Sequence, residues 1–384
     1  MARWSEDGQQ RWALWRSERG APPPARILVA DDRSRADDAY GAACQGTALL
    51  WRGDFQNARQ LLKAMASRAD RKPRSAARTG APRPAGSPAS GSPADAFNRE
   101  RQARAQRART LGMLLIPLDA DYTIPLRRAP DLRQACTEAW GPAQGPSLVP
   151  LRELLGVIGA HEWRKRGIEV PAAGGRIHPH YGVFAPVRNE YVDLVVRAPL
   201  PADPAALTAF DIGTGTGVLA AVLARRGIAR VLATDLNPRA LACARENLGR
   251  LDPAGRVEVL QADLFPPGRA GLIVCNPPWL PARPGSALEE AVYDPGSRML
   301  LGFLAGLAAH LEPGGEGWLI LSDLAEHLGL RSRDELLAAF SAAGLAVVGR
   351  LDARPTHPRA SDPADPLHAA RRAELTSLWR LAAR

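Results

Sequence analysis

The most constraining feature of the sequence is a regular alternation of strand-like and helix-like segments that begins at Leu207. Short apolar runs, typical of buried strands, occupy residues 207–212, 230–234, 257–261, 272–275 and 318–321. Amphipathic helical patterns occupy residues 218–226, 238–248, 297–310 and 334–343. Because strands that alternate with helices form a parallel sheet covered on both faces, we expect a doubly wound α/β domain. A further strand is expected at 345–351 and a short helix at 375–381.

The chain before residue 171 is organised differently. Residues 73–93, PRSAARTGAPRPAGSPASGSP, are rich in Pro, Gly, Ser and Ala and lack the apolar residues that would offset the entropy of ordering. The expected parts are a small α+β unit at 1–69, a disordered linker at 70–97, a substrate-recognition region at 98–170 and the main domain at 171–384.

Local patterns predict the elements of the two regions before the main domain. The first contains strands at 26–30 and 47–51 and a helix that Asp54 caps and that ends near residue 67. The second contains a basic helix in FNRERQARAQRART, a hairpin of 113–116 and 122–126, and a helix at 151–166. The arginines of the basic helix could bind nucleic acid or could form a solvated helix face, and the sequence leaves both interpretations open.

Charge, cysteine content and hydropathy exclude several classes of protein. The chain has 50 basic and 40 acidic residues; residues 1–110 hold 21 and 11 of them, so the net charge of +10 belongs to this part. The four cysteines form no Cys-x-x-Cys pair, which disfavours a disulfide framework or a metal site, and His178 and His180 read as part of a loop. The N-terminus has no apolar signal core, and no run of about 18 apolar residues could span a membrane. We therefore expect a cytoplasmic protein that uses no metal.

A glycine-rich loop follows the first strand of the main domain, in the order Asp211-Ile212-Gly213-Thr214-Gly215-Thr216-Gly217. Glycines at such a turn let a ligand approach the backbone and face the N-terminus of the next helix. The dinucleotide pattern G-x-G-x-x-G does not fit, because its third glycine would fall on Val218. The loop therefore predicts a cofactor site other than that of a dehydrogenase.

Acidic residues follow the next two strands. Asp235 ends the second strand, where an acid can bind the two hydroxyls of a ribose. Asp263 ends the third, where an acid can accept from an adenine amino group while Leu264 lies against the ring. Either acid alone could be an ordinary strand-end cap. Since ligands bind at the carboxyl edge of an open parallel sheet, acids after three consecutive strands predict a nucleoside site.

The fourth strand of the main domain ends in Asn276-Pro277-Pro278-Trp279. Two prolines stop a strand because neither can donate to a ladder. The motif could only end the strand, or it could be a catalytic motif that follows the three strand ends of the nucleoside site.

Four segments in this order resemble a class I S-adenosylmethionine-dependent methyltransferase: DIGTGTGVLA, ATDLNPRALACARENL, QADLF and LIVCNPPWLP. More narrowly, they are similar to the "methyltransferase small" group with an N-P-P-aromatic motif, which includes ribosomal RNA guanine-N2 and protein glutamine-N5 methyltransferases. The resemblance covers about residues 175–350. It implies a seven-stranded, mostly parallel Rossmann-like sheet and S-adenosyl-L-methionine as the cofactor.

The resemblance also implies roles for the residues of the cofactor site. The loop of Gly213, Thr214, Gly215, Thr216 and Gly217 would hold the methionine part of the cofactor, with Asp211 near its amino group. The ribose would be held by Asp235 with Leu236 beside it, and the adenine by Asp263 and Leu264. Asn276 would lie next to the bound cofactor.

The resemblance assigns catalysis to Asn276, Pro277, Pro278 and Trp279. The target nitrogen of this group is planar and conjugated, so its lone pair is a poor nucleophile. The side-chain oxygen of Asn276 and the carbonyl of Pro277 would accept from its hydrogens and hold it in place. The two prolines fix the backbone so that the acceptors converge, and Trp279 offers a flat face for stacking.

Several substrates and one non-catalytic role remain compatible with these motifs. An exocyclic base amine in RNA, ribosomal RNA above all, is the preferred target because the first 110 residues are basic. The alternative is a protein glutamine, which suits the zero net charge of residues 111–384. A small-molecule substrate and a relative that only binds nucleic acid are further alternatives.

Overall fold

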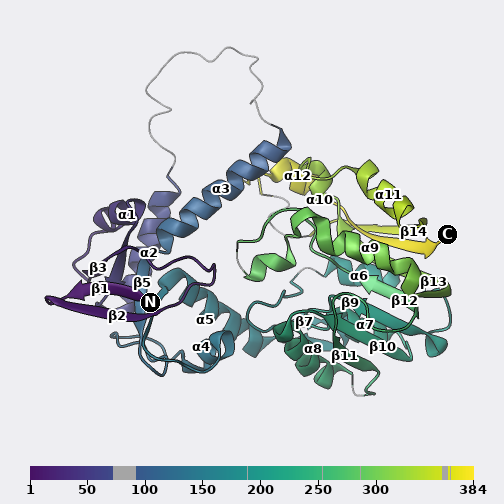
Figure 1. The fold of residues 1–384 in the computed structure, drawn as a ribbon, viewed down its shortest axis with the longest axis horizontal. Helices are drawn as coiled ribbons and strands as arrows, with labels where there is room; N and C mark the ends of the chain where they lie inside the picture. The colour runs from purple at the N-terminus through teal and green to yellow at the C-terminus, as the bar shows by residue number, and fades with distance from the viewer. Residues whose placement is uncertain (72–91, 188, 253, 286, 357–361, 364) are drawn as a thin grey trace, which may run out of the picture. The chain divides into compact units, whose positions relative to one another are not determined.

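The structure, a computed structural model, describes residues 1–71, 92–187, 189–252, 254–285, 287–356, 362–363 and 365–384. The chain forms two compact units, Met1–His161 and Glu162–Arg384, each with its own large sheet (Figure 1). Residues 72–91 of the predicted linker lie outside the described residues. Its last predicted residues, 93–97, instead begin a helix, and residues 98–161 belong to the same unit as 1–69. The observed boundary thus lies at 161/162, whereas the sequence suggested 170/171.

A six-stranded mixed sheet with the order β1-β2-β6-β5-β4-β3 forms the N-terminal unit. Its strands are β1 (Ala2–Glu6), β2 (Gln9–Trp15), β3 (Arg26–Ala30), β4 (Thr47–Trp51), β5 (Leu114–Leu118) and β6 (Ser147–Pro150). Its helices are α1 (Ala36–Cys44), α2 (Phe55–Ala69), α3 (Pro93–Leu111), α4 (Arg133–Trp140) and α5 (Leu151–Arg166), the last of which crosses the boundary between the units. The predicted α+β character of this region is confirmed.

Most local predictions for the N-terminal unit are confirmed, and one is wrong. The strands predicted at 26–30 and 47–51 are β3 and β4, and Asp54 caps α2 by accepting from the backbone N–H of Gln56 at 2.8 Å. The predicted hairpin of 113–116 and 122–126 does not form. Residues 122–126 are not a strand, because β4 and β6, distant in sequence, take both edges of β5.

The C-terminal unit contains a seven-stranded sheet with the order β11-β10-β9-β12-β13-β15-β14. Its strands are β9 (Thr208–Ile212), β10 (Arg230–Asp235), β11 (Val257–Gln261), β12 (Ala270–Cys275), β13 (Leu311–Ser322), β14 (Leu345–Ala353) and β15 (Thr376–Ala383). Its helices are α6 (Glu190–Arg197), α7 (Val218–Arg225), α8 (Pro238–Leu251), α9 (Arg298–His310), α10 (Leu324–His327), α11 (Arg333–Ala342) and α12 (His368–Ala373). A small hairpin of β7 (Ile168–Val170) and β8 (Gly175–Ile177) precedes the sheet, and short 3-10 helices lie at Pro171–Ala173, Pro204–Ala206, Ala287–Ala291 and Pro295–Ser297. The doubly wound, mostly parallel seven-stranded sheet is confirmed.

Helices cover both faces of this sheet, as its apolar strands require. Adjacent residues of one strand point to opposite faces, so Ala209 of β9 contributes to one core and Phe210 to the other. The first core contains side chains of α6, α7 and α8, and the second contains side chains of α9 and α11. Neither face of the central strands is left for solvent, which explains their nearly continuous apolar sequences.

The short helix predicted at 375–381 is wrong, because residues 376–381 belong to β15. This strand inserts between β13 and β14 and runs antiparallel to both, with Leu319 opposite Trp379 and Leu351 opposite Leu378. Both edges of β15 are therefore paired and both of its faces are buried. The conformation of a segment that joins the sheet after a long connection is determined by the strands with which it pairs rather than by its local sequence pattern.

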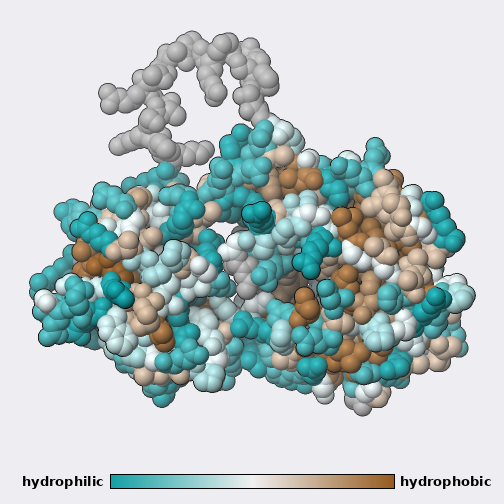
Figure 2. Space-filling view, viewed as in Figure 1, coloured by the Kyte–Doolittle hydropathy of each residue, from teal (hydrophilic) through white to brown (hydrophobic). Residues whose placement is uncertain are grey.

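The surface is mixed in character. On the face in view in Figure 2, hydrophilic side chains dominate over the N-terminal unit. Among the exposed large apolar side chains are Leu28 and Val29 of β3, an edge strand. Within the described residues, no helix has both the length and the apolar content needed to cross a membrane.

Candidate active site

Pairing registers bring the predicted site residues to one edge of the C-terminal sheet. Ile212, the last residue of β9, pairs with Thr234 of β10 on one side and with Cys275 of β12 on the other. Since neighbouring strands lie about 4.8 Å apart, the glycine loop, Asp235 and Asn276 leave the sheet side by side. Asp235 in turn pairs with Gln261 of β11, two residues before Asp263. Four segments that are distant in sequence therefore meet at the carboxyl ends of consecutive strands.

The glycines of the loop are required by its backbone. Gly213, Gly215 and Gly217 have φ angles of +72°, +55° and +81°, in the left-handed region that only glycine adopts cheaply. A Cβ on Gly217 would lie 3.2 Å from Leu248 of α8, so the third glycine also permits close helix packing. A Cβ on Gly215 would meet nothing nearer than the Gly213 carbonyl at 4.0 Å, so the loop is open at this point. This geometry explains the D-x-G-x-G-x-G register.

Asp211 lies beneath the loop rather than at its surface. Its side chain is 1% exposed, and Oδ2 accepts from the Thr214 hydroxyl at 2.6 Å and from the Ala220 backbone N–H at 3.1 Å. Burial raises the pKa of this carboxyl to about 6. Asp211 therefore joins the loop to the first turn of α7, and its ionised form is destabilised by the lack of solvent.

We expect Asp211→Asn to be more stable than the wild type at neutral pH. The ordinary pKa of 3.8 rises to about 6 in the folded state, so the fold binds a proton between these values that the unfolded chain does not. Stability should fall as pH rises through this window, by roughly 3 kcal/mol in total. Asparagine does not titrate, so the stability gap between the variants should open above about pH 4 and level off above about pH 6. Urea unfolding across this range measures it, and a gap independent of pH would contradict the prediction.

Asp235 joins the second strand to the glycine loop. Its Oδ2 accepts from the Gly215 backbone N–H at 3.0 Å, and its Oδ1 accepts from the Asn237 backbone N–H at 2.9 Å. Burial raises its pKa as well. Each oxygen keeps a second lone pair, so the carboxylate can still accept from a ligand. Leu236, the next residue, is 59% exposed at the rim.

The two predicted residues at the end of the third strand differ in exposure. Asp263 is exposed, whereas Leu264 is partly buried and has a φ of +70°, which is strained for a residue with a branched side chain. The Thr234 hydroxyl donates to the Leu264 carbonyl at 2.6 Å and holds this conformation. The Leu264 side chain packs on α9, where a Cβ on Gly302 would come within 2.8 Å of it. Backbone strain of this kind is concentrated at ligand sites, and the adenine contact of Asp263 and Leu264 stays a prediction.

The Asn-Pro-Pro-Trp motif contains an internal hydrogen bond that the sequence did not predict. The Trp279 indole N–H donates to Oδ1 of Asn276 at 2.9 Å. Pro277 is buried, while Asn276, Pro278 and Trp279 are half-buried, and Trp279 packs against both cores of the sheet. The indole ring is therefore fixed by packing, and its N–H fixes the orientation of the Asn276 amide.

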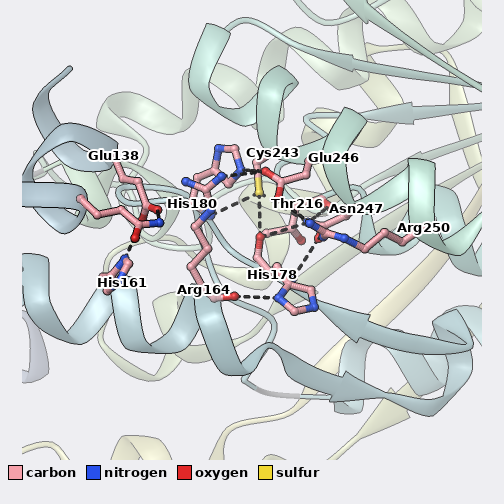
Figure 3. A network of polar contacts seen from close by, with 11 residues as sticks. Glu138, His161, Arg164, His178, His180, Thr216, Cys243, Glu246, Asn247 and Arg250 are labelled. Carbon is pink, nitrogen blue, oxygen red and sulfur yellow. Dashed lines mark hydrogen bonds and ion pairs between the residues drawn. The ribbon is translucent and has the colours of Figure 1, made fainter. Parts of the chain in front are cut away.

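Sequence reasoning missed one buried polar residue of the site, Asn247 of α8. Its side chain is fully buried; Nδ2 donates to the Thr216 carbonyl of the glycine loop at 3.0 Å, and Oδ1 accepts from the His178 N–H at 2.9 Å (Figure 3). His180 lies in the same network, and its N–H donates to Sγ of Cys243 at 3.3 Å. The only available signal was an asparagine on the buried face of an amphipathic helix. Among the described residues, no cluster of three or more His, Cys, Asp or Glu could hold a metal ion.

Asn247→Leu should destabilise the C-terminal unit and weaken the glycine loop together. Leucine has a similar size but leaves the Thr216 carbonyl and the His178 N–H buried without partners, at a cost of roughly 2–4 kcal/mol. The free energy of unfolding in urea measures the first effect and the affinity for S-adenosyl-L-methionine the second. Ala242→Leu, on the exposed side of α8, is the matched control and should change neither quantity appreciably. An Asn247→Leu variant as stable as the control would contradict the assigned role.

Residues 175–343 match the family model of the methyltransferase small domain. This part of the chain is similar to a methyltransferase small domain. The match confirms the resemblance carried by the four sequence segments, and it begins at β8 and ends after α11. The N-terminal unit lies outside the matched residues.

Curated relatives match less than half of the chain. The release factor glutamine methyltransferase of Cereibacter sphaeroides is 38% identical over 161 residues, which are 38% of this chain and 56% of the relative. The ribosomal protein L11 methyltransferase of Pelotomaculum thermopropionicum is 37% identical over 37% of this chain and 39% of its own length. The chain thus spans about half the length, or less, of these relatives.

Among solved structures, the chain is similar to a SAM-dependent methyltransferase from Geobacter sulfurreducens in complex with S-adenosyl-L-homocysteine. The identity is 19%, the TM-score is 0.35, and the similarity covers 56% of this chain and 99% of the other. The assignment of the methyltransferase small domain rests on the family match and on the strand order, not on this value.

Proposed function

We propose that the methyltransferase small domain binds S-adenosyl-L-methionine and transfers its methyl group to an amide nitrogen of a protein glutamine. The observation that carries the proposal is the common edge of β9, β10, β11 and β12, where the glycine loop, two acids and Asn276 meet. A dehydrogenase would need neither the observed glycine register nor an amide beside the loop.

The residues present fit this cofactor. The positive-φ loop of Gly213 to Gly217 is open to a close approach at Gly215 and would hold the methionine part. Asp235 keeps free lone pairs for the ribose hydroxyls, and the exposed Asp263 can accept from the adenine amino group. The exposed Leu236 offers an apolar edge to the ring system. When bound, the cofactor supplies a methyl group on a positively charged sulfur. The sulfur becomes a neutral thioether when the methyl group is transferred, so it needs no acid catalyst as a leaving group.

Asn276 would position the substrate nitrogen and polarise it. Its Oδ1 has two lone pairs, and the Trp279 indole occupies one of them, so the other can accept an N–H of the substrate. The Pro277 carbonyl is the second acceptor. Together they would hold a planar nitrogen in place and favour a geometry with a freer lone pair, which is catalysis by positioning and electrostatics. The fixed indole means that little reorganisation is needed when the substrate arrives.

The comparisons favour a protein substrate over the RNA that the sequence suggested. The two curated relatives are named for a release factor glutamine and for ribosomal protein L11. Neither of these names supports RNA. The basic charge that favoured RNA belongs to residues 1–110, whereas residues 111–384 carry no net charge. A protein amide therefore replaces the base amine as the proposed target.

Transfer of tritiated methyl groups tests this function. The purified chain is incubated with labelled S-adenosyl-L-methionine and a lysate of cells that lack the protein. We expect label that survives ribonuclease, is lost with protease, and is recovered as N5-methylglutamine after enzymatic digestion. Label in RNA would overturn the amide proposal, and failure to bind the cofactor in calorimetry would overturn the methyltransferase proposal itself.

A further inference from the structure

A groove opens on the N-terminal unit, in a region outside the family match. It has a volume of about 520 Å³ and lies between α2, α3 and α5. Its lining residues are Gln56, Arg59, Gln60, Leu62, Lys63, Ala66, Arg107, Leu111, Arg152 and Leu155. On α2 the lining residues recur at helical spacing and so form one face, while Phe55, Ala58 and Met65 of the same helix are buried in the unit.

The rim of the groove is strongly basic. Four cations line it, Arg59, Lys63, Arg107 and Arg152, and none of the described lining residues is acidic. Arg107 forms a two-fold contact with Asp70, at 2.7 and 3.0 Å, but Arg59 donates only to the neutral amide of Gln56. The side chains of Lys63 and Arg152 have no ion pair or hydrogen bond with any described residue. Two of the four cationic side chains thus make no hydrogen bond or close ion pair within the part of the chain that the structure describes.

Like charges crowd around Arg152. Burial, and then the neighbouring charges of Arg19 and Arg107, lower the pKa of its guanidinium, and the opposing effect of the Glu153 and Glu18 carboxylates is smaller. The nearest carboxylate in sequence, Glu153, attracts Arg152 without a hydrogen bond to it, and its Oε2 accepts from the Glu18 backbone N–H at 2.8 Å. An external anion would relieve this repulsion, and arginine binds carboxylates and phosphates in two-fold geometry.

The floor of the groove distinguishes between possible anions. It is aliphatic, formed by Leu62, Ala66, Leu111 and Leu155, and no aromatic side chain is among the described lining residues. Single-stranded RNA is bound through stacking on aromatic side chains together with cations, so an RNA would leave the floor uncovered. A peptide with both carboxylates and aliphatic side chains would satisfy rim and floor together.

We infer that this groove is a docking site for an acidic, amphipathic segment of a partner protein. The carboxylates of the segment pair with Lys63, Arg152 and Arg59, and its aliphatic side chains cover Leu111 and Leu155. Gln60 supplies an amide for backbone groups of the segment. The site lies within the N-terminal unit and does not depend on the methyl transfer proposed for the other unit.

Fluorescence anisotropy with the full chain tests the site. The probe is a short labelled peptide with leucine at helical spacing and glutamate elsewhere. Lys63→Glu and Arg152→Glu should each weaken its binding about tenfold or more, since each reverses a charge at the rim. Arg99→Glu is the matched control, because it makes the same charge change on an exposed position of α3 outside the groove, and it should change binding less than about twofold.

Additional variants and probes distinguish a peptide groove from a surface that attracts any anion. Lys63→Gln provides a milder variant if a reversed charge disturbs folding, which circular dichroism monitors. A peptide in which serine replaces leucine should bind at least about tenfold more weakly, since the aliphatic floor is then unused. No binding of the acidic peptide, equal losses in Arg99→Glu and Lys63→Glu, or a labelled oligouridine that binds tightly and is lost in the groove variants would each overturn the inference.

Discussion

An Asn276→Ala variant should lose about a thousandfold in kcat while it still binds S-adenosyl-L-methionine. The variant removes the side-chain acceptor that would hold the substrate nitrogen, and the loss of one preorganised polar group in an active site costs about 10² to 10³ in rate. Cofactor affinity should change less than about threefold, because the glycine loop, Asp235 and Asp263 do not bond to Asn276. Single-turnover methyl transfer and calorimetry measure the two quantities.

Trp279→Phe is the informative companion to this variant. It keeps a ring between the two cores but removes the N–H that donates to Asn276. The variant therefore measures how much the orientation of the Asn276 amide contributes while the amide itself is kept. We expect about a tenfold loss in kcat, since the Asn276 amide remains but is free to rotate. Near wild-type activity in Asn276→Ala would refute the catalytic role, and equal losses in both variants would mean that orientation by Trp279 accounts for the whole effect.

The main sheet could be predicted because the apolar sequences of its strands themselves indicate that the strands are buried. Strands β9, β10 and β12 are covered on both faces, so each reads as an apolar run bounded by polar residues. The segment at 375–381 could not be assigned in the same way. Its apolar residues fit either a helix or a strand, and only the two open edges of β13 and β14 decide for the strand.

Some residues of the candidate site could likewise be predicted from the sequence, and others could not. The positions of Asp235 and Asn276 follow from strand ends, because consecutive parallel strands share a carboxyl edge. The contact of Asn247 with the Thr216 carbonyl joins residues 31 positions apart, and it depends on how α8 packs against the loop. The basic groove depends likewise on α5 joining α2 and α3. Local patterns contain no information about such contacts.

Asp235→Ala should weaken the binding of S-adenosyl-L-methionine by roughly a hundredfold or more. Two effects add in this variant, because the carboxylate would accept from the ribose hydroxyls and also accepts from the Gly215 and Asn237 backbone N–H groups. Hydrogen bonds to a charged group contribute about 1.5–3 kcal/mol each, so the loss of two ribose contacts alone accounts for this factor. Release of the Gly215 N–H should loosen the loop further.

Asp263→Ala separates the two effects, because the structure gives the exposed Asp263 side chain no hydrogen bond with a described residue. This variant should lose only its contact with the cofactor and weaken binding about tenfold, without change in the free energy of unfolding. Asp235→Ala should lower stability as well, since it leaves the Gly215 N–H of the loop and the Asn237 N–H before α8 without their acceptor. Calorimetry and urea unfolding on both variants check the contrast. If Asp235→Ala bound the cofactor within about threefold of the wild type, the edge formed by β9 and β10 would not be the cofactor site, and Asn276 would have no methyl donor beside it.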